Sequence, residues 1–134
     1  MADEKSSVLP IRTQSDVVLV RQAVRDWSKE LGFSLVDQTK IVTAASELAR
    51  NTLEYGGGGE LTLTVLREGF RKGLRLSFTD QGPGIADLGL ALKDGYTTGG
   101  GLGLGLSGAK RLMNDFEITS KVGEGTTVTV TRWK

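Results

Sequence analysis

The chain has neither cysteine nor histidine among its 134 residues. Without cysteine there can be no disulfide, and the two absences together exclude the common zinc sites, the Ser/His and Cys/His triads and a phosphohistidine on this chain. No apolar run approaches the ~18 residues of a membrane span. The polar, acidic start does not resemble a secretion signal. We therefore expect a cytoplasmic protein with no membrane partner.

The chain also has no large excess of positive or negative charge. Lys and Arg total 17 against 16 for Asp and Glu, and the basic residues are scattered along the chain. A nucleic-acid-binding protein would gather positive charge on one face, so we expect no nucleic-acid partner. Proline is scarce at 2 residues, whereas glycine is abundant at 19. That share is roughly twice the usual ~7%, and beside strong apolar periodicity it indicates a site.

Apolar spacing predicts three helices and five strands. Ser15 is the expected N-cap of the first helix, which runs to about Leu31, and the second helix covers residues 35–55. No linker or repeat divides the chain, so a single domain over residues 1–134 is expected. The order predicts an α+β two-layer sandwich, with helices on one face of a mostly antiparallel mixed sheet. The strands are expected at 8–12, 61–66, 74–79, 116–121 and 126–133, and the third helix after a mobile glycine-rich loop at 99–108.

Asp80 follows a strand in which Leu74, Leu76 and Phe78 alternate with polar residues. Continuing the alternation places its carboxylate on the core face, where it needs a hydrogen-bond donor such as the amine of adenine. The neighbouring Gly82 and Gly84 leave room for a planar base. The competing interpretation is a carboxylate that only caps the turn at 81–84.

Glu47 and Asn51 lie four residues apart on the second helix and therefore share a face. An asparagine oxygen is a suitable magnesium ligand, and a nearby glutamate can accept a proton from an attacking hydroxyl. The competing interpretation is a pair of ordinary solvated helix residues.

The glycine-rich segment opens a helix, where unpaired backbone N–H groups attract phosphate. It matches G-x-G-x-x-G at 103–108, but no buried parallel strand precedes it, and it lacks the Lys-Ser/Thr of a P-loop. A flexible hinge is the competing interpretation. Thr126 shares the core face with Val128 and Val130, so its hydroxyl could reach the same pocket as Asp80. Alone, it is equally an ordinary β-branched strand residue.

These features occur in the order seen in the Bergerat-fold ATPases, the superfamily of gyrase and the histidine kinases. The chain resembles the small serine/threonine kinase branch that includes bacterial anti-sigma factors, over nearly its whole length. The resemblance is carried by SELARN at 46–51, DQGPGI at 80–85, GLGLGL at 101–106 and KRLM at 110–113.

The resemblance implies ATP and Mg²⁺ as cofactors. Glu47 would be the general base, Asn51 the magnesium ligand and Asp80 the acceptor for the adenine amine, with support from Thr126. It also implies a serine or threonine substrate on a STAS-domain protein, and release of the kinase toward a downstream phosphatase. Gly82 and Gly84 would line the base pocket, and the phosphate lid would comprise Gly99, Gly100, Gly101, Leu102, Gly103, Leu104 and Gly105.

The cation that would face the γ-phosphate is not evident, since only Lys93, Lys110 and Arg111 flank the glycines. One alternative is therefore a nucleotide-dependent anti-sigma or partner-switching module without essential kinase activity. Another is a detached histidine-kinase domain with its acceptor histidine on a second chain. The carboxylate of Glu47 favours the serine/threonine kinase, because a pure binding module needs no base.

Overall fold

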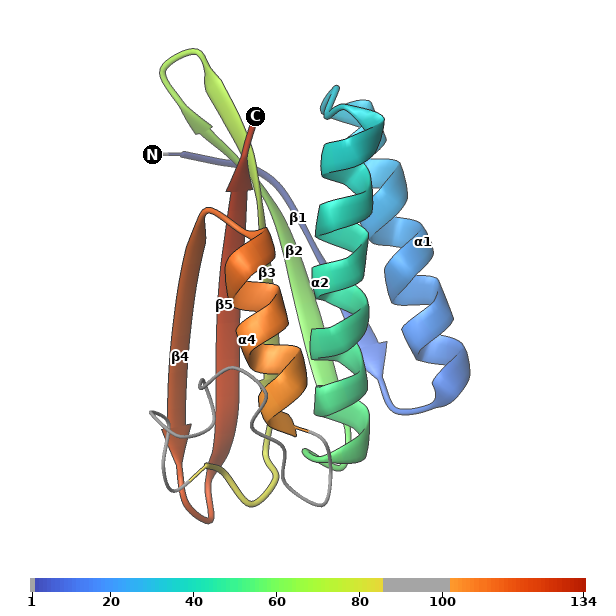
Figure 1. Cartoon of the computed structure of the whole chain (residues 1–134), viewed down its shortest axis with the longest axis vertical. Coiled ribbons are helices and arrows are strands. Elements are labelled where there is room, and N and C mark those ends of the chain that lie inside the picture. The colour runs from blue at the N-terminus through green and yellow to red at the C-terminus, as the bar shows by residue number, and fades with distance from the viewer. Residues whose placement is uncertain (1, 86–101) are drawn as a thin grey trace.

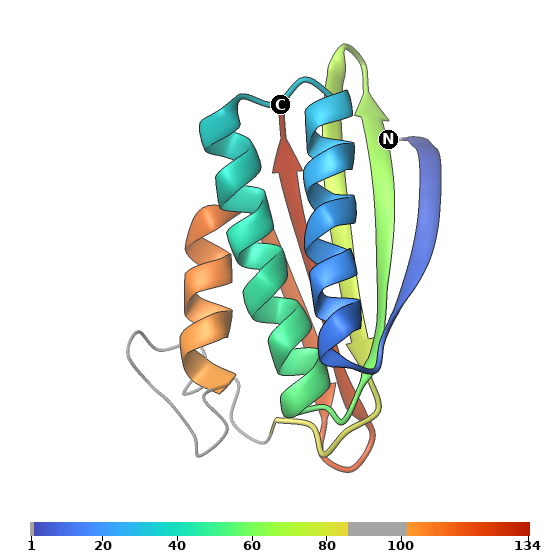
Figure 2. The same cartoon turned by 90° about the vertical axis from the view of Figure 1, so that its right-hand side faces the viewer.

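The computed structural model describes residues 2–85 and 102–134. The strands are β1 (Ala2–Ile11), β2 (Gly59–Glu68), β3 (Arg71–Asp80), β4 (Asp115–Lys121) and β5 (Gly125–Trp133). The described helices are α1 (Gln14–Glu30), α2 (Leu35–Glu54) and α4 (Leu102–Leu112). The strands form one sheet in the order β1-β2-β3-β5-β4. The helices cover one face of it, side by side in Figure 2 (Figures 1 and 2).

The predicted α+β two-layer sandwich is confirmed, with one difference in the sheet. All four strand pairings within the described residues are antiparallel, so the expected mixed character is not found there. Hairpin turns join β2 to β3 and β4 to β5, which brings the antiparallel neighbours together with short connections. None of the helices described here is both long and apolar enough to cross a membrane.

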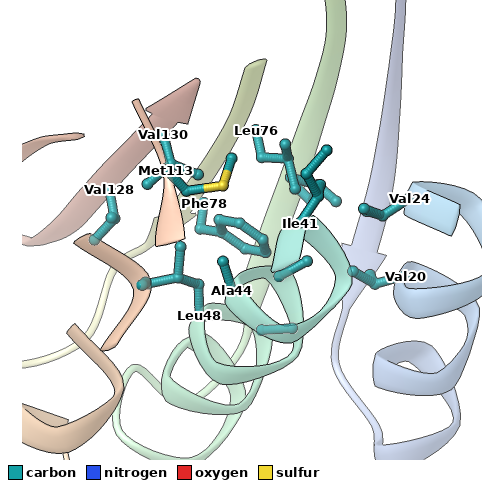
Figure 3. Packing of buried hydrophobic residues seen from close by; sticks show 14 of the residues in the cluster. Val20, Val24, Ile41, Ala44, Leu48, Leu76, Phe78, Met113, Val128 and Val130 are labelled. Atoms are coloured by element: carbon teal, nitrogen blue, oxygen red, sulfur yellow. The ribbon is translucent and has the colours of Figure 1, made fainter. Parts of the chain in front are cut away.

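The core lies between the helices and the covered face of the sheet. Figure 3 shows Phe78 and Leu76 of β3 pointing toward Ile41 and Leu48 of α2, with Met113 beside them (Figure 3). Strand alternation sends every second side chain of β2 and β3 into this layer, and helical spacing supplies the opposite side. The fully buried side chains include Val20, Val24, Ile41, Leu61, Leu63, Leu74 and Leu76.

Helix α1 begins earlier than the sequence suggested. Its N-cap is Thr13, not Ser15: the Thr13 hydroxyl accepts from the Asp16 amide at 3.2 Å, and the Asp16 carboxylate accepts from the Thr13 amide at 3.2 Å. This reciprocal pair is a capping box, which satisfies two backbone donors at once and outcompetes a single serine cap.

Helix α4 also begins earlier, inside the segment expected to be a loop. It starts at Leu102, and its buried residues Leu106 and Ala109, followed by Met113 directly after the helix ends, lie at helical spacing against the core. That apolar stripe supports a helix despite the glycines, because tertiary burial outweighs weak intrinsic propensity. The expectation of a loop over residues 102–108 was therefore wrong.

Strand β1 is longer than predicted, Ala2–Ile11 instead of 8–12. Its first half is polar and exposed, and its register with β2 shifts between Asp3 and Lys5. An exposed edge strand buries too little to show alternation, so its length left no apolar pattern in the sequence.

Both tryptophans lie toward the β2–β3 turn. Trp133 pairs with Gly73 on β3, and the Arg71 guanidinium sits 4.5 Å from its ring. Trp27, near the end of α1, has the Lys5 ammonium 4.2 Å from its ring, and Lys5 pairs with Val65 of β2. Each ring is therefore covered by a cation.

Candidate functional site

A small cavity lies where the end of β3 and the start of β5 meet the last two turns of α2. Asp80 and Thr126 are register partners on β3 and β5, and both line it together with Asn51 of α2. The structure thus brings together three of the predicted site residues from three elements. The remaining lining is Leu48, Thr52, Tyr55, Phe78, Ile85, Leu106 and Val128, a mostly apolar wall.

The Asp80 carboxylate is partly withdrawn from water. Burial raises its pKa above the usual aspartate range, and hydrogen bonds from the backbone N–H groups of Gly82 and Thr126 oppose that rise in part. The Gly82 amide donates to Asp80 Oδ1 at 2.9 Å. Asp80 therefore caps its own turn and also faces the cavity. The two arrangements weighed from the sequence are compatible, and its role toward adenine stays a prediction.

The loops around Asp80 pack so closely that side chains would not fit. A Cβ at Gly56 would overlap the Asp80 carboxylate, and one at Gly82 would lie 2.7 Å from the Gly56 Cα. Gly84 has φ +76°, and a Cβ there would overlap the Lys121 carbonyl. Neither Gly82 nor Gly84 lines the cavity, so each acts by letting backbones approach one another.

Two hydroxyls that we did not expect fix the loop after Asp80. Tyr55 Oη donates to the Gly84 carbonyl at 3.0 Å, and the Ile85 amide donates to Ser120 Oγ at 2.8 Å. The spacing of Tyr55, four residues after Asn51, was a signal that could have revealed it. No signal in the sequence could have revealed Ser120, because its partner Ile85 lies 35 residues away.

Glu47 is not part of this cavity. It lies one turn before Asn51 on α2, with Oε1 3.2 Å from Nη1 of Arg50 and its side chain 38% exposed. It lines a separate groove on the outer surface between α1 and α2, beside Arg21 and Arg25. The described residues therefore do not bring Glu47 into the group formed by Asp80, Asn51 and Thr126.

The predicted phosphate segment is only partly described. Gly99, Gly100 and Gly101 lie outside the described residues, as does Lys93, while Leu102, Gly103, Leu104 and Gly105 form the first turn of α4. Figure 2 shows that the start of α4 and the end of α2 lie at the same end of the molecule. The first backbone N–H groups of α4 are therefore near the helix that carries Asn51, and helix N-termini favour anions.

Lys110 and Arg111 lie in the last turn of α4. Both described candidates for the cation that would face the γ-phosphate thus lie at the end of α4 opposite its first turn. In the described part of the chain, no three His, Cys, Asp or Glu side chains gather to hold a metal by themselves.

A wider hollow of the described residues lies elsewhere, on the face of the sheet that the helices leave open. It measures about 610 Å³ and includes Thr62, Arg75, Glu117 and Trp133, and none of the predicted nucleotide residues lines it. It is wide and open, and its lining mixes polar residues with Leu66, Phe116 and Trp133, whereas the smaller cavity has the apolar walls and few polar groups typical of small-molecule sites. We therefore take the cavity at Asp80 as the candidate site.

The chain belongs to the histidine kinase-, DNA gyrase B- and HSP90-like ATPase family, whose model matches residues 36–134. It is 46% identical to the serine/threonine-protein kinase RsbT of Bacillus subtilis (strain 168) over 127 residues, which are 95% of this chain and 96% of that protein. These matches confirm the ATPase superfamily and the kinase branch that the motifs predicted.

Solved structures share the fold. The RsbU and RsbW domains of a Mycobacterium tuberculosis protein superpose with a TM-score of 0.63 at 24% identity, covering 96% of this chain and 32% of that one. This chain thus spans about a third of that protein's length. The SiaB–SiaC complex from Pseudomonas aeruginosa gives a TM-score of 0.56 at 14% identity, covering 98% and 91%. At these identities the likeness supports the fold alone.

Proposed function

We propose that the chain is a protein serine/threonine kinase that uses Mg-ATP to phosphorylate a STAS-domain partner in a bacterial stress or sigma-factor pathway. The observation that carries the proposal is the Asp80 carboxylate, which lines an apolar cavity together with Asn51 and Thr126. The 46% identity to a serine/threonine kinase over most of both chains supports the reaction class.

The chemistry of the cavity fits an adenine base. Asp80 can accept a hydrogen bond from an exocyclic amine, and Phe78, Leu48 and Val128 give a planar base apolar contact. The cavity holds about 20 Å³, the room of one water, so a base enters only if lining side chains such as Ile85 and Leu106 move apart.

Magnesium fits through the nucleotide rather than through a cage of carboxylates. The Asn51 side chain offers one hard oxygen at the edge of the cavity, and Mg²⁺ commonly takes one or two protein ligands together with substrate phosphates. Asn51 would hold the ion, and the ion would neutralise charge on the transferring phosphoryl group. The first turn of α4, including Leu102 to Gly105, together with Gly99 to Gly101, would contact the phosphates.

One observation favours a second function. Glu47, which would act as the general base, is paired with Arg50 and stands outside the cavity. A partner-switching module whose nucleotide only shapes a docking surface would need no base. For the kinase, Glu47 must exchange Arg50 for the substrate hydroxyl when the protein partner binds.

Glu47→Gln separates the two functions. It keeps the shape of the side chain and removes the carboxylate, so single-turnover phosphorylation of a STAS-domain partner from radiolabelled ATP should fall by at least ~100-fold with little change in ATP affinity. Glu54→Gln is the matched control, since it makes the same change on an exposed position of the same helix.

Asn51→Ala should impair magnesium-dependent ATP binding as well as transfer. Label that survives acid on a serine or threonine supports the kinase, whereas acid-labile label on a second chain would indicate a histidine-kinase domain. Transfer by Glu47→Gln at the unmodified rate would favour the binding module.

A further inference from the structure

Ser120 lies in the middle of a hydrogen-bond cluster that borders the cavity. Its hydroxyl is 2.8 Å from the Ile85 amide, 3.1 Å from the Gly125 carbonyl and 2.8 Å from the Thr126 hydroxyl. It is the register partner of Thr126 across β4 and β5, and Thr126 is in turn the partner of Asp80. One serine thus links the loop after Asp80 to the strand that faces it.

Counting hydrogens fixes the direction of each bond in this cluster. A hydroxyl has one hydrogen and two acceptor lone pairs. The Ile85 amide can only donate and the Gly125 carbonyl can only accept, so Ser120 accepts from Ile85 and gives its own hydrogen to Gly125. Its second lone pair is then left for Thr126. One arrangement satisfies all three contacts, and in it the Thr126 hydroxyl donates to Ser120.

This direction determines what Thr126 can offer to a ligand. With its hydrogen engaged by Ser120, Thr126 Oγ1 presents only lone pairs to the cavity, and the ionised Asp80 carboxylate also only accepts. The two polar groups that β3 and β5 bring to the cavity are therefore both acceptors. A 6-amine has two N–H groups and can donate to both of them. A 6-carbonyl has none, so it sets acceptor against acceptor at that position and leaves only the N1–H of a 6-oxo purine to donate.

We propose that Ser120 is a positioning residue that makes the cavity selective for 6-amino purines over 6-oxo purines, by holding the Thr126 hydroxyl as an acceptor. This inference rests on the proposed nucleotide site and adds to it the group that sets base selectivity. Ser120 acts through Thr126 and need not touch the base.

The test compares ATP, which carries a 6-amine and an unprotonated N1, with ITP, which carries a 6-carbonyl and an N1–H. In Ser120→Ala the Thr126 hydroxyl loses its acceptor and is free to donate into the cavity, so ATP should bind more weakly and ITP relatively better. We expect the selectivity ratio, the dissociation constant of ITP divided by that of ATP, to fall by about 3- to 10-fold, the range of a single neutral hydrogen bond. Isothermal titration calorimetry on the full chain measures both constants.

Three further variants distinguish positioning from structural support. Ser120→Thr keeps the hydroxyl on a strand and should retain the ratio. Ser77→Ala removes the hydroxyl of another cross-strand pair, 3.0 Å from Thr129 and lining the hollow on the open face of the sheet, and should leave the ratio unchanged. In a Thr126→Val background, Ser120→Ala should no longer alter the ratio, because the residue it acts through is gone.

If Ser120 had only a structural role, Ser120→Ala would weaken the binding of ATP and of ITP equally. An unchanged ratio in Ser120→Ala, or a fall in ratio that persists in the Thr126→Val background, overturns the inference while leaving an ATP-selective site in place. If the unmodified protein bound neither nucleotide, the proposed function itself would fail and take this inference with it. Should Ser120→Ala not fold, Ser120→Cys serves as the test variant, because its sulfur is only a weak acceptor for the Thr126 hydroxyl.

Discussion

The two ends of the β3–β5 strand pair are built in opposite ways. At one end Asp80 faces Thr126, and the backbones of neighbouring loops close around the carboxylate. At the other end Gly73 faces Trp133, whose ring covers the glycine and is itself covered by Arg71. The same antiparallel ladder therefore ends in packed backbone on one side and in stacked side chains on the other.

This contrast shows what a buried polar group requires. A withdrawn carboxylate needs donors close by, and backbone amides supply them only where glycine allows the chain to approach. The Trp133 end holds an exposed turn with Phe70 fully exposed, and side-chain stacking suffices there. Changes at the first end should therefore affect ligand binding, whereas changes at the second should affect stability alone.

Among changes at the two ends of the β3–β5 pair, the largest effect is expected from Asp80→Ala. It removes the acceptor for the adenine amine, and a hydrogen bond to a charged group contributes roughly 1.5 to 3 kcal/mol, so ATP should bind at least ~10-fold more weakly. Arg71→Ala at the opposite end is the control and should leave ATP affinity unchanged. Calorimetric titration of both variants measures the affinity. Equal losses of ATP affinity in the two variants would contradict the proposed difference between the ends.

A smaller effect is expected from adding one methyl group at each end. Gly56→Ala places a Cβ against the Asp80 carboxylate, and Gly73→Ala places one 2.7 Å from the Trp133 ring. Overpacking of this kind costs typically about 1 to 3 kcal/mol, so urea denaturation should show lower stability for both. Only Gly56→Ala should also weaken ATP binding. If Gly73→Ala weakened it as much, the two ends would be coupled.

The smallest effect is a dependence on pH at the Asp80 end. Because the pKa of Asp80 is raised in the fold by burial, its contribution to stability is fully present below the unfolded value of about 3.9 and is lost as the pH rises through the folded value. The stability of the unmodified protein relative to Asp80→Asn, which does not titrate, should therefore fall over that window.

ATP affinity should rise over the same window, because binding uses the ionised carboxylate. Denaturation and titration series at matched pH values test the pair of trends. A stability difference that rose with pH would mean that the pKa of Asp80 is lowered instead.

Local and periodic features of the fold were predictable from the sequence. Helix α2 was expected over residues 35–55 and is observed at Leu35–Glu54, because its apolar stripe and its glycine stop are both local signals. The inward direction of Asp80 followed from two further steps of strand alternation after Phe78. Where burial is regular, position in the sequence determines which face a residue occupies.

Contacts between distant backbones were not predictable. Nothing local shows that Gly56 lies against the Asp80 carboxylate, or that Ser120 holds Ile85, since these approaches depend on how whole elements pack. The N-cap at Thr13 depended on its reciprocal bond with Asp16. The ligand-binding and catalytic roles of Glu47, Asn51, Asp80, Thr126 and residues 99–105 remain predictions.

The two cation-covered rings have a practical consequence for spectroscopy. Trp27 and Trp133 are the chain's two tryptophans, and neither lines the cavity at Asp80. We therefore expect their intrinsic fluorescence to change on unfolding, when the Lys5 and Arg71 contacts are lost, and to stay constant when nucleotide is added. The protein thus carries an internal reference signal, against which a fluorescent ATP analogue can be followed in the same cuvette.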